Sequence, residues 1–163
     1  EDALKKAMDK DEKLLSPYFY LPLIYLETGD YRQAAGYLRK GIEKEADFPE
    51  FHSNLALVLE EAGEVDEAER EYARAIELHP GLLKPHRNLG ELCYKRGNYE
   101  RALKEFEFLV EKGESDFGLF LRLGDAYYRL GERERAIEAW EKAKKLQPEN
   151  PLVRENLELA RSQ

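Results

Sequence analysis

The chain has 163 residues, of which 37% are charged and 42% hydrophobic, and its formal net charge is −8. These proportions predict a folded domain rather than a disordered segment, and the acidic balance argues against nonspecific binding to nucleic acid or to an anionic membrane surface. The single cysteine excludes an internal disulfide framework and a four-cysteine zinc site.

The N-terminal residues of this sequence predict neither a secretion signal nor a membrane span. No basic segment followed by an apolar one opens the chain, and the longest uncharged run, residues 14–26, is shorter than the ~20 residues that cross a bilayer. We expect a cytoplasmic protein, with a periplasmic or membrane-anchored one as the alternative. Because the first residue is Glu1 rather than methionine, we expect a piece of a longer polypeptide. Residues 1–14 predict a flanking helix, with Leu4 and Ala7 at packing positions.

The sequence after this segment repeats every 34 residues. Apolar residues fall at helical spacing before a glycine that suits a left-handed helix cap, and a polar turn and a second amphipathic stretch follow. This pattern predicts an all-α fold of two-helix units at 15–48, 49–82, 83–116 and 117–150, closed by a capping helix at 151–163. The recurring columns are Gly29, Gly63, Gly97 and Gly131; Ala34, Ala68, Ala102 and Ala136; Leu21, Leu55, Leu89 and Leu123; and Leu38, Tyr72, Phe106 and Trp140.

These columns resemble the tetratricopeptide repeat over residues 15–148. The resemblance implies a right-handed superhelix of four helical hairpins in one helical-repeat domain, whose first helices line a concave groove. The fourth unit carries the pattern most fully, at Leu123, Gly124, Tyr127, Gly131, Ala136, Trp140, Ala143 and Pro148.

The first unit departs from the pattern at Pro22, where the family has glycine or alanine. A proline inside a helix removes one backbone hydrogen bond and clashes with the carbonyl four residues earlier. We therefore expect the helix from Pro17 to Thr28 to be kinked or irregular near Tyr18 to Pro22.

Reactive and metal-binding side chains do not form a convincing site. Cys93 occupies the column of Tyr25, Leu59 and Tyr127, which predicts a buried packing residue; a reactive thiol is the alternative. His52 and His86 occupy a column that packs the two helices of a hairpin together, and no two histidines have the i, i+4 spacing of a helical metal pair. The glycines are periodic caps rather than a phosphate loop. We expect no enzyme, no cofactor and no metal.

The resemblance implies a groove built from set positions on the first helices. In this sequence they include Asn54, Asn88 and Asn156, which form one column with Arg122 substituting in the fourth unit. A carboxamide both donates and accepts, so such a column can pair with the backbone of an extended peptide; alternatively, asparagine is simply the common residue there. The groove residues are Phe19, Tyr20, Leu23, Asn54, Leu57, Lys84, Arg87, Asn88, Glu91, Tyr94, Lys95, Arg122, Asp125, Tyr128, Arg129 and Asn156.

The second half of this groove is predicted to be basic. Its basic residues outnumber its two acidic ones, which favours an acidic peptide or a free carboxylate as ligand. The alternative is internal pairing, for instance of Arg122 with Asp125 or of Arg87 with Glu91. The dicarboxylate clamp of heat-shock co-chaperones is incomplete in either register, so that specific function is rejected. The basic residues are Lys84, Arg87, Lys95, Arg122 and Arg129.

The first unit instead presents an aromatic and aliphatic face. An exposed apolar patch usually contacts a partner, which here is a hydrophobic ligand segment, a second copy of the chain or an upstream part of the same polypeptide. The preferred function is a non-catalytic protein-interaction scaffold that binds a peptide or protein segment, an acidic one in particular, and no nucleic acid. The alternatives are a self-association or assembly domain of a larger polypeptide and a secretion or assembly chaperone.

Overall fold

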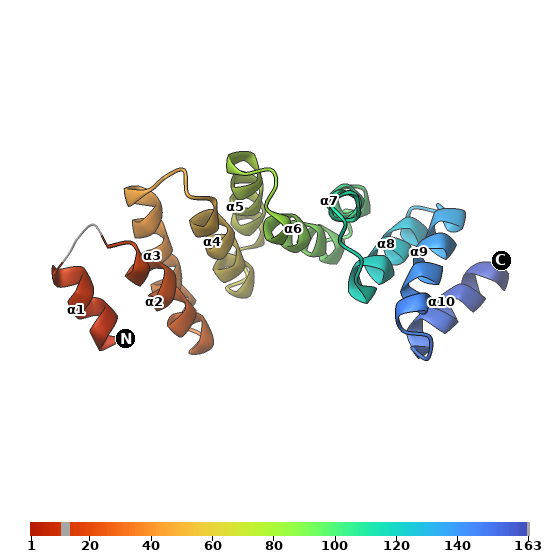
Figure 1. Cartoon of the computed structure of the whole chain (residues 1–163), viewed down its shortest axis with the longest axis horizontal. Helices are drawn as coiled ribbons and strands as arrows, with labels where there is room; N and C mark the ends of the chain where they lie inside the picture. Colours follow the sequence, from red (N-terminus) through yellow and green to blue (C-terminus); the bar gives the residue numbers. More distant parts are fainter. Residues whose placement is uncertain (11–13, 163) are drawn as a thin grey trace. The chain divides into compact units, whose positions relative to one another are not determined.

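The computed structural model describes residues 1–10 and 14–162, and in these residues all regular secondary structure is helical (Figure 1). The predicted all-α class is therefore confirmed. No helix in the described ranges is both long enough and apolar enough to cross a bilayer. The helices are α1 (Asp2–Lys10), α2 (Ser16–Glu27), α3 (Tyr31–Lys44), α4 (Pro49–Glu61), α5 (Val65–Leu78), α6 (Leu83–Lys95), α7 (Tyr99–Glu111), α8 (Phe117–Arg129), α9 (Arg133–Leu146) and α10 (Pro151–Ser162).

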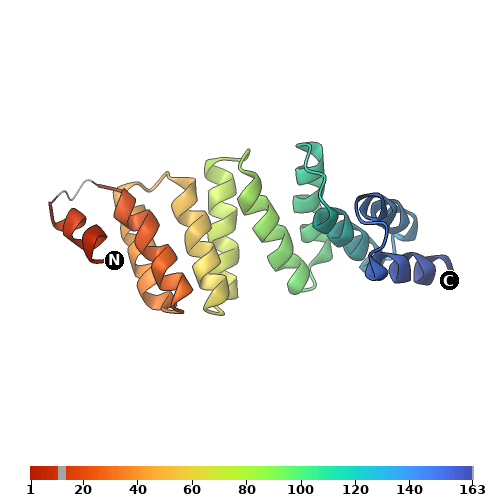
Figure 2. The ribbon, with the colours of Figure 1, turned by 60° about the horizontal axis from the view of Figure 1, so that its bottom comes forward.

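The chain divides into two compact units, Glu1–Pro85 and His86–Gln163. In the first unit each helix from α1 to α5 packs against the next one along the chain (Figure 2). In the second unit α7 packs on α8, α8 on α9, and α9 on α10. Consecutive helices thus form antiparallel hairpins, as the sequence predicts. The helix expected within residues 1–14 is present as α1, and residues 11–13 lie outside the described part of the chain.

The periodic glycines end the first helix of each hairpin. Gly63, for example, has a φ of +82°, a left-handed conformation that costs glycine little because it lacks a Cβ. There the N–H of Gly63 donates to the carbonyl of Glu60 at 3.0 Å, and the N–H of Glu64 donates to that of Leu59 at 2.8 Å. These bonds satisfy carbonyls that the helix end would otherwise leave open. The same positive φ recurs at Gly29, Gly97 and Gly131.

In the third and fourth hairpins a glycine on the first helix faces a large side chain on the second. A Cβ added to Gly124 would lie 2.4 Å from the indole of Trp140, and one added to Gly90 would lie 2.6 Å from the ring of Phe106. Only glycine permits these contacts, because real Cβ atoms do not approach that closely. Trp140 and Phe106 are fully buried, so this pairing forms the centre of these two hairpins.

Helix α2 is continuous from Ser16 to Glu27 and contains Pro22 within it. The expectation that this helix is kinked or irregular near Tyr18 to Pro22 stays a prediction, because continuity of the helix does not exclude a bend. Pro22 leaves the carbonyl of Tyr18 without its usual helical donor. Leu21 and Pro22 are both buried, and we infer that packing of this face offsets the missing hydrogen bond.

Ion pairs connect the second helices of successive hairpins in both units. In the first unit Arg39 of α3 donates to Glu67 of α5, with Nη2 and Oε1 separated by 2.8 Å. In the second unit Arg135 of α9 donates to Glu107 of α7, at 2.6 Å between the same kinds of atoms. The two pairs occupy equivalent positions two repeats apart, with the charges exchanged. Each is partly exposed, so it contributes about 0.2–1 kcal/mol.

Candidate peptide-binding groove

In the first unit, the predicted groove positions on α2 and α4 surround a shallow pocket of about 400 Å³. Tyr20 and Leu23 are 57% and 48% exposed there, so the apolar face predicted for the first repeat is present. Phe19 is held more firmly, because its ring stacks on Phe51 with 4.1 Å between the ring centroids. Asn54 of α4 also lines this pocket, next to an apolar wall.

The three asparagines of the predicted column differ in their hydrogen bonding. Asn54 and Asn88 are half-buried, and within the described residues their carboxamides make no hydrogen bond. Asn156 of α10 donates from Nδ2 to Oδ1 of Asp125 at 3.1 Å. Two carboxamides are therefore available to a ligand, while the third holds an acidic side chain in place.

Arg87, on α6, forms ion pairs at the start of α8. Its Nη2 lies 2.7 Å from Oε2 of Glu114 and 2.8 Å from Oδ2 of Asp116. Asp116 also caps α8, accepting from the N–H of Leu119 at 3.0 Å. Partial burial opposes ionisation of Asp116, but the Leu119 N–H and the Arg87 guanidinium together lower its pKa. The suggested pairing of Arg87 with Glu91 is replaced by these two contacts.

Arg122, on α8, contacts two groove residues of α6. Its Nε donates to Oε2 of Glu91 at 3.0 Å, and its guanidinium lies 4.8 Å from the ring centroid of Tyr94. Its Nη1 is 3.8 Å from Oδ2 of Asp125, so the suggested pairing with Asp125 is present as a longer contact. Internal pairing thus neutralises Arg122, and the basic character predicted for this part of the groove is smaller than the residue count indicates.

Asp125 lies in the interior of this arrangement. Its Oδ1 accepts from Nε1 of Trp140 at 3.0 Å in addition to the bond from Asn156. Burial raises the pKa of the Asp125 carboxyl, although the hydrogen bonds from Trp140 and Tyr94 and the charge of Arg122 act in the opposite direction. Burial and the neighbouring Asp125 charge likewise raise the pKa of Tyr94.

A second pocket, of about 380 Å³, lies beside Asp125 in the second unit. We call it the groove pocket. Leu152 and Leu159 of α10 form one wall and are 47% and 48% exposed. Arg129 stands at its edge, exposed and without a hydrogen bond or ion pair to any described residue. The remaining lining comes from Tyr94, Asp125, Tyr128, Trp140 and Asn156.

Of the other predicted positions, Leu57 is half-buried on α4, and Lys84 and Lys95 are exposed near the two ends of α6. Leu152 is a pocket residue that the repeat register alone does not select. Its spacing of four residues before Asn156 and seven before Leu159 places it on the same helical face, which is the signal that identifies it.

The family model described as tetratricopeptide repeat matches residues 23–82 and 87–156. The chain belongs to the tetratricopeptide repeat family. The two stretches include most of the repeat helices, whereas the groove positions Phe19, Tyr20 and Lys84 lie outside them. No curated protein sequence matches this tetratricopeptide repeat chain.

Solved structures support the same fold. MamA 41-end from Desulfovibrio magneticus RS-1 is 24% identical, with 91% of this chain and 84% of that one covered and a TM-score of 0.83. YrrB, a TPR protein with an unusual peptide-binding site, is 16% identical, with 98% and 82% covered and a TM-score of 0.88. PilF of Pseudomonas aeruginosa is 26% identical, with 93% and 69% covered and a TM-score of 0.74. At these identities the likeness establishes the fold.

Cys93, His52 and His86 are buried packing residues, as predicted. Cys93 is 1% exposed. Across their hairpins, Nδ1 of His52 lies 2.7 Å from Oε2 of Glu71, and Nδ1 of His86 lies 2.5 Å from Oε2 of Glu105. The sequence interpretation missed these acidic partners, although each follows its histidine by 19 residues. In the described ranges no group of three or more His, Cys, Asp or Glu side chains is placed to hold a metal ion.

Proposed function

We propose that this chain is a non-catalytic scaffold that binds an extended peptide segment along the groove faces of its first helices. The observation that supports this most directly is the pair Asn54 and Asn88, which occupy the same position one repeat apart. Both carboxamides are half-buried, and neither is hydrogen-bonded within the described residues. A polar group in such a position gains stability when a ligand supplies its hydrogen bonds.

The ligand chemistry follows from the groove pocket. Its wall of tyrosine and leucine side chains suits an apolar ligand side chain, and Arg129 beside it offers an unpaired guanidinium to a carboxylate. Arg87 and Arg122 are engaged with acidic residues of the chain itself. We therefore propose a peptide with one apolar residue next to one acidic group, rather than a strongly acidic segment.

The test measures binding of fluorescein-labelled peptides by anisotropy. The probes are acetylated decapeptides in which one leucine precedes either glutamate or glutamine in an otherwise alanine and serine background. Replacement Arg129→Glu should weaken binding of the glutamate peptide about tenfold or more, because it exchanges a charge-assisted bond for repulsion. The matched control is Arg70→Glu on α5, which reverses an exposed arginine outside the groove positions and should change nothing.

The asparagines are tested with the same peptides. Replacement of Asn54 or Asn88 by alanine should weaken binding of both peptides equally, by about two- to tenfold, because each removes hydrogen bonds to the ligand backbone. Equal affinity of wild type and both asparagine variants would reject backbone pairing. An Arg129→Glu variant that binds the glutamate peptide normally would reject the acidic contact.

Self-association is the second candidate function, because Tyr20 and Leu23 form an exposed apolar face on α2. Such a face suits another copy of the chain, or a segment of a larger polypeptide, as well as a ligand side chain. A chaperone that shields apolar partner segments would use the same face. Peptide binding is preferred because the available carboxamides have no role in an apolar interface.

A further inference from the structure

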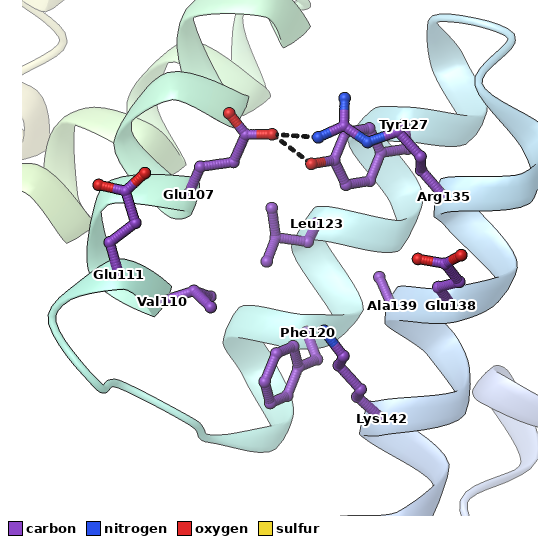
Figure 3. A pocket seen from close by; sticks show the side chains of 10 residues that line it. All are labelled: Glu107, Val110, Glu111, Phe120, Leu123, Tyr127, Arg135, Glu138, Ala139 and Lys142. Carbon is purple, nitrogen blue, oxygen red and sulfur yellow. Dashed lines mark hydrogen bonds and ion pairs between the residues drawn. The ribbon is translucent and has the colours of Figure 1, made fainter.

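A third pocket, of about 440 Å³, lies in the second unit and shares no residue with the predicted groove. Helix α8 supplies its floor, and α7 and α9 supply its two walls (Figure 3). We call it the α7–α9 pocket. Its volume is within the range of about 300–1,000 Å³ that is typical of ligand sites.

The α7–α9 pocket is open because one side chain is small. In the second and third repeats the ring of a histidine on the first helix contacts a glutamate 19 residues later, on the second helix. The equivalent pair in the fourth repeat is Phe120 and Ala139, both of which line the pocket. Ala139 carries only a methyl group where the second and third hairpins have Glu71 and Glu105.

The floor of the pocket is apolar and narrow. Phe120, Leu123 and Ala139 line it, yet their exposed fractions are only 8%, 5% and 6%. Each offers a small strip of surface rather than a broad face. An unbranched chain of methylene groups can lie along such a strip.

The charges around the α7–α9 pocket favour a cation. Glu107 forms a hydrogen bond with the hydroxyl of Tyr127 and an ion pair with Arg135, so these groups satisfy one another at one end (Figure 3). Glu111 and Glu138 are exposed and form no ion pair or hydrogen bond with described residues. In Figure 3 the floor residues Leu123 and Ala139 lie between these two carboxylates.

Besides Arg135, which is paired with Glu107, one further basic side chain lines the pocket. The ammonium of Lys142 lies 5.6 Å from the centroid of the Phe120 ring, which places it on the aromatic floor rather than in an ion pair with either free glutamate. Two carboxylates without partners therefore exceed one ammonium, and the chain as a whole carries a net charge of −8. Both the local and the total charge attract a basic group.

We propose that the α7–α9 pocket binds a lysine or arginine side chain of a partner protein. The methylene stem lies along the floor formed by Phe120, Leu123 and Ala139, and the charged head contacts Glu111 or Glu138. Basic side chains combine an apolar stem with a charged tip in this way, so a single side chain uses both features of the pocket. This site is independent of the groove and adds a second contact point for a partner.

The test follows amide chemical shifts of the isotope-labelled chain during titration with N-acetyl-arginine methylamide. The neutral controls are the matching derivatives of citrulline, which keeps the shape without the charge, and norleucine, which keeps only an apolar chain. Arginine should produce saturable millimolar shifts in α7, α8 and α9, and both neutral probes should bind about fivefold or more weakly.

Two variants locate the binding. Replacement Ala139→Leu fills the pocket floor without adding a charge and should abolish the shifts. The double replacement Glu111→Gln and Glu138→Gln keeps the surface polar and should weaken arginine binding about fivefold, even if Ala139→Leu fails to fold. Arg129→Glu in the groove should leave arginine binding to the α7–α9 pocket unchanged. Failure of the groove proposal can therefore be distinguished from failure of this one. Equal binding of norleucine or citrulline, or no saturable shift with arginine, would overturn the proposal.

Discussion

Asp125 is the residue on which the second-unit part of the groove is centred. It is a partly buried carboxylate that accepts hydrogen bonds from Trp140 on its own hairpin and from Asn156 on α10. Burial raises its pKa above the ordinary value of 3.8 because the charged form loses hydration. Asp125 thus connects α8, α9 and α10. Its ionised form lowers the stability of the folded state, because the buried charge loses hydration.

This cost predicts an unusual dependence of stability on pH. The folded state binds the Asp125 proton more tightly than the unfolded chain does. Its contribution to the free energy of unfolding is therefore fully present below pH 3.8 and is lost as the pH rises through the folded-state pKa. The stability of wild type relative to Asp125→Asn should fall as the pH rises from 3.8 through the folded-state pKa, as measured by urea unfolding.

Asp116 supplies a control of opposite sign. Its pKa is lowered, so its stabilisation is present above pH 3.8 and is lost as the pH falls through the folded-state pKa. The stability of wild type relative to Asp116→Asn should therefore rise between about pH 3 and pH 5. If the two variants showed the same pH slope, the environment assigned to Asp125 would be incorrect.

At the level of elements, equivalent positions in three hairpins carry different pairs of side chains. In the second and third hairpins a histidine forms a hydrogen bond with a glutamate, and the fourth has Phe120 and Ala139, which both line the α7–α9 pocket. Each polar pair requires both of its members, because removing one leaves a buried donor or acceptor without a hydrogen bond and lowers the free energy of unfolding. The apolar pair has no such requirement, which is why it can leave a cavity.

The third hairpin offers a test of this difference. Replacement Glu105→Ala should lower the free energy of unfolding by about 1–3 kcal/mol, because buried His86 loses its carboxylate. The double replacement His86→Phe and Glu105→Ala copies the pair of the fourth hairpin and should recover much of the loss. Urea unfolding monitored by circular dichroism measures both. A double variant less stable than the single one would contradict this account.

The hairpins were predictable because four periodic columns specify caps and packing at once. The glycine column fixes the left-handed turns, and the small residues opposite Phe106 and Trp140 fix the closeness of the helices. The continuity of α2 through Pro22 was not predictable, because burial of that face outweighs the local preference of proline.

The helices that carry the candidate site were predictable, whereas the pairing of its charged side chains was not. Register alone places Asn54 and Asn88 on first helices. It cannot show that Arg122 pairs with Glu91, because that contact joins residues 31 apart whose side chains meet only after the repeats stack. Nor does it show the α7–α9 pocket, which arises from the small size of Ala139 within a tertiary contact.

For the whole molecule, the net charge and the exposed apolar face of α2 have opposite effects on self-association. A net charge of −8 makes identical chains repel one another at neutral pH. Tyr20 and Leu23, at 57% and 48% exposure, favour contact with another apolar surface. The patch formed by these side chains is small for a stable interface between copies, so repulsion should dominate at neutral pH.

This balance predicts the state of association. Sedimentation equilibrium should show a monomer at micromolar concentrations and pH 7, and weak association as the pH approaches the isoelectric point and repulsion declines. Leu23→Glu should suppress that association, whereas Leu146→Glu, which changes an exposed leucine at the end of α9, should act only through its charge. Stable dimers at pH 7 that Leu23→Glu dissociates would favour self-association as the principal function.

The exchanged charges of the two interhelical ion pairs bear on how the repeats find their correct neighbours during folding. Arg39 with Glu67, and Glu107 with Arg135, occupy equivalent positions. If hairpins docked out of order by two repeats, Arg39 would meet Arg135 and Glu107 would meet Glu67, so both contacts would join like charges. In a chain built from similar units, misassembly is a main hazard. The exchanged charges of the two ion pairs therefore disfavour misplaced stacking of the hairpins, and they do so at little cost to the stability of the native state.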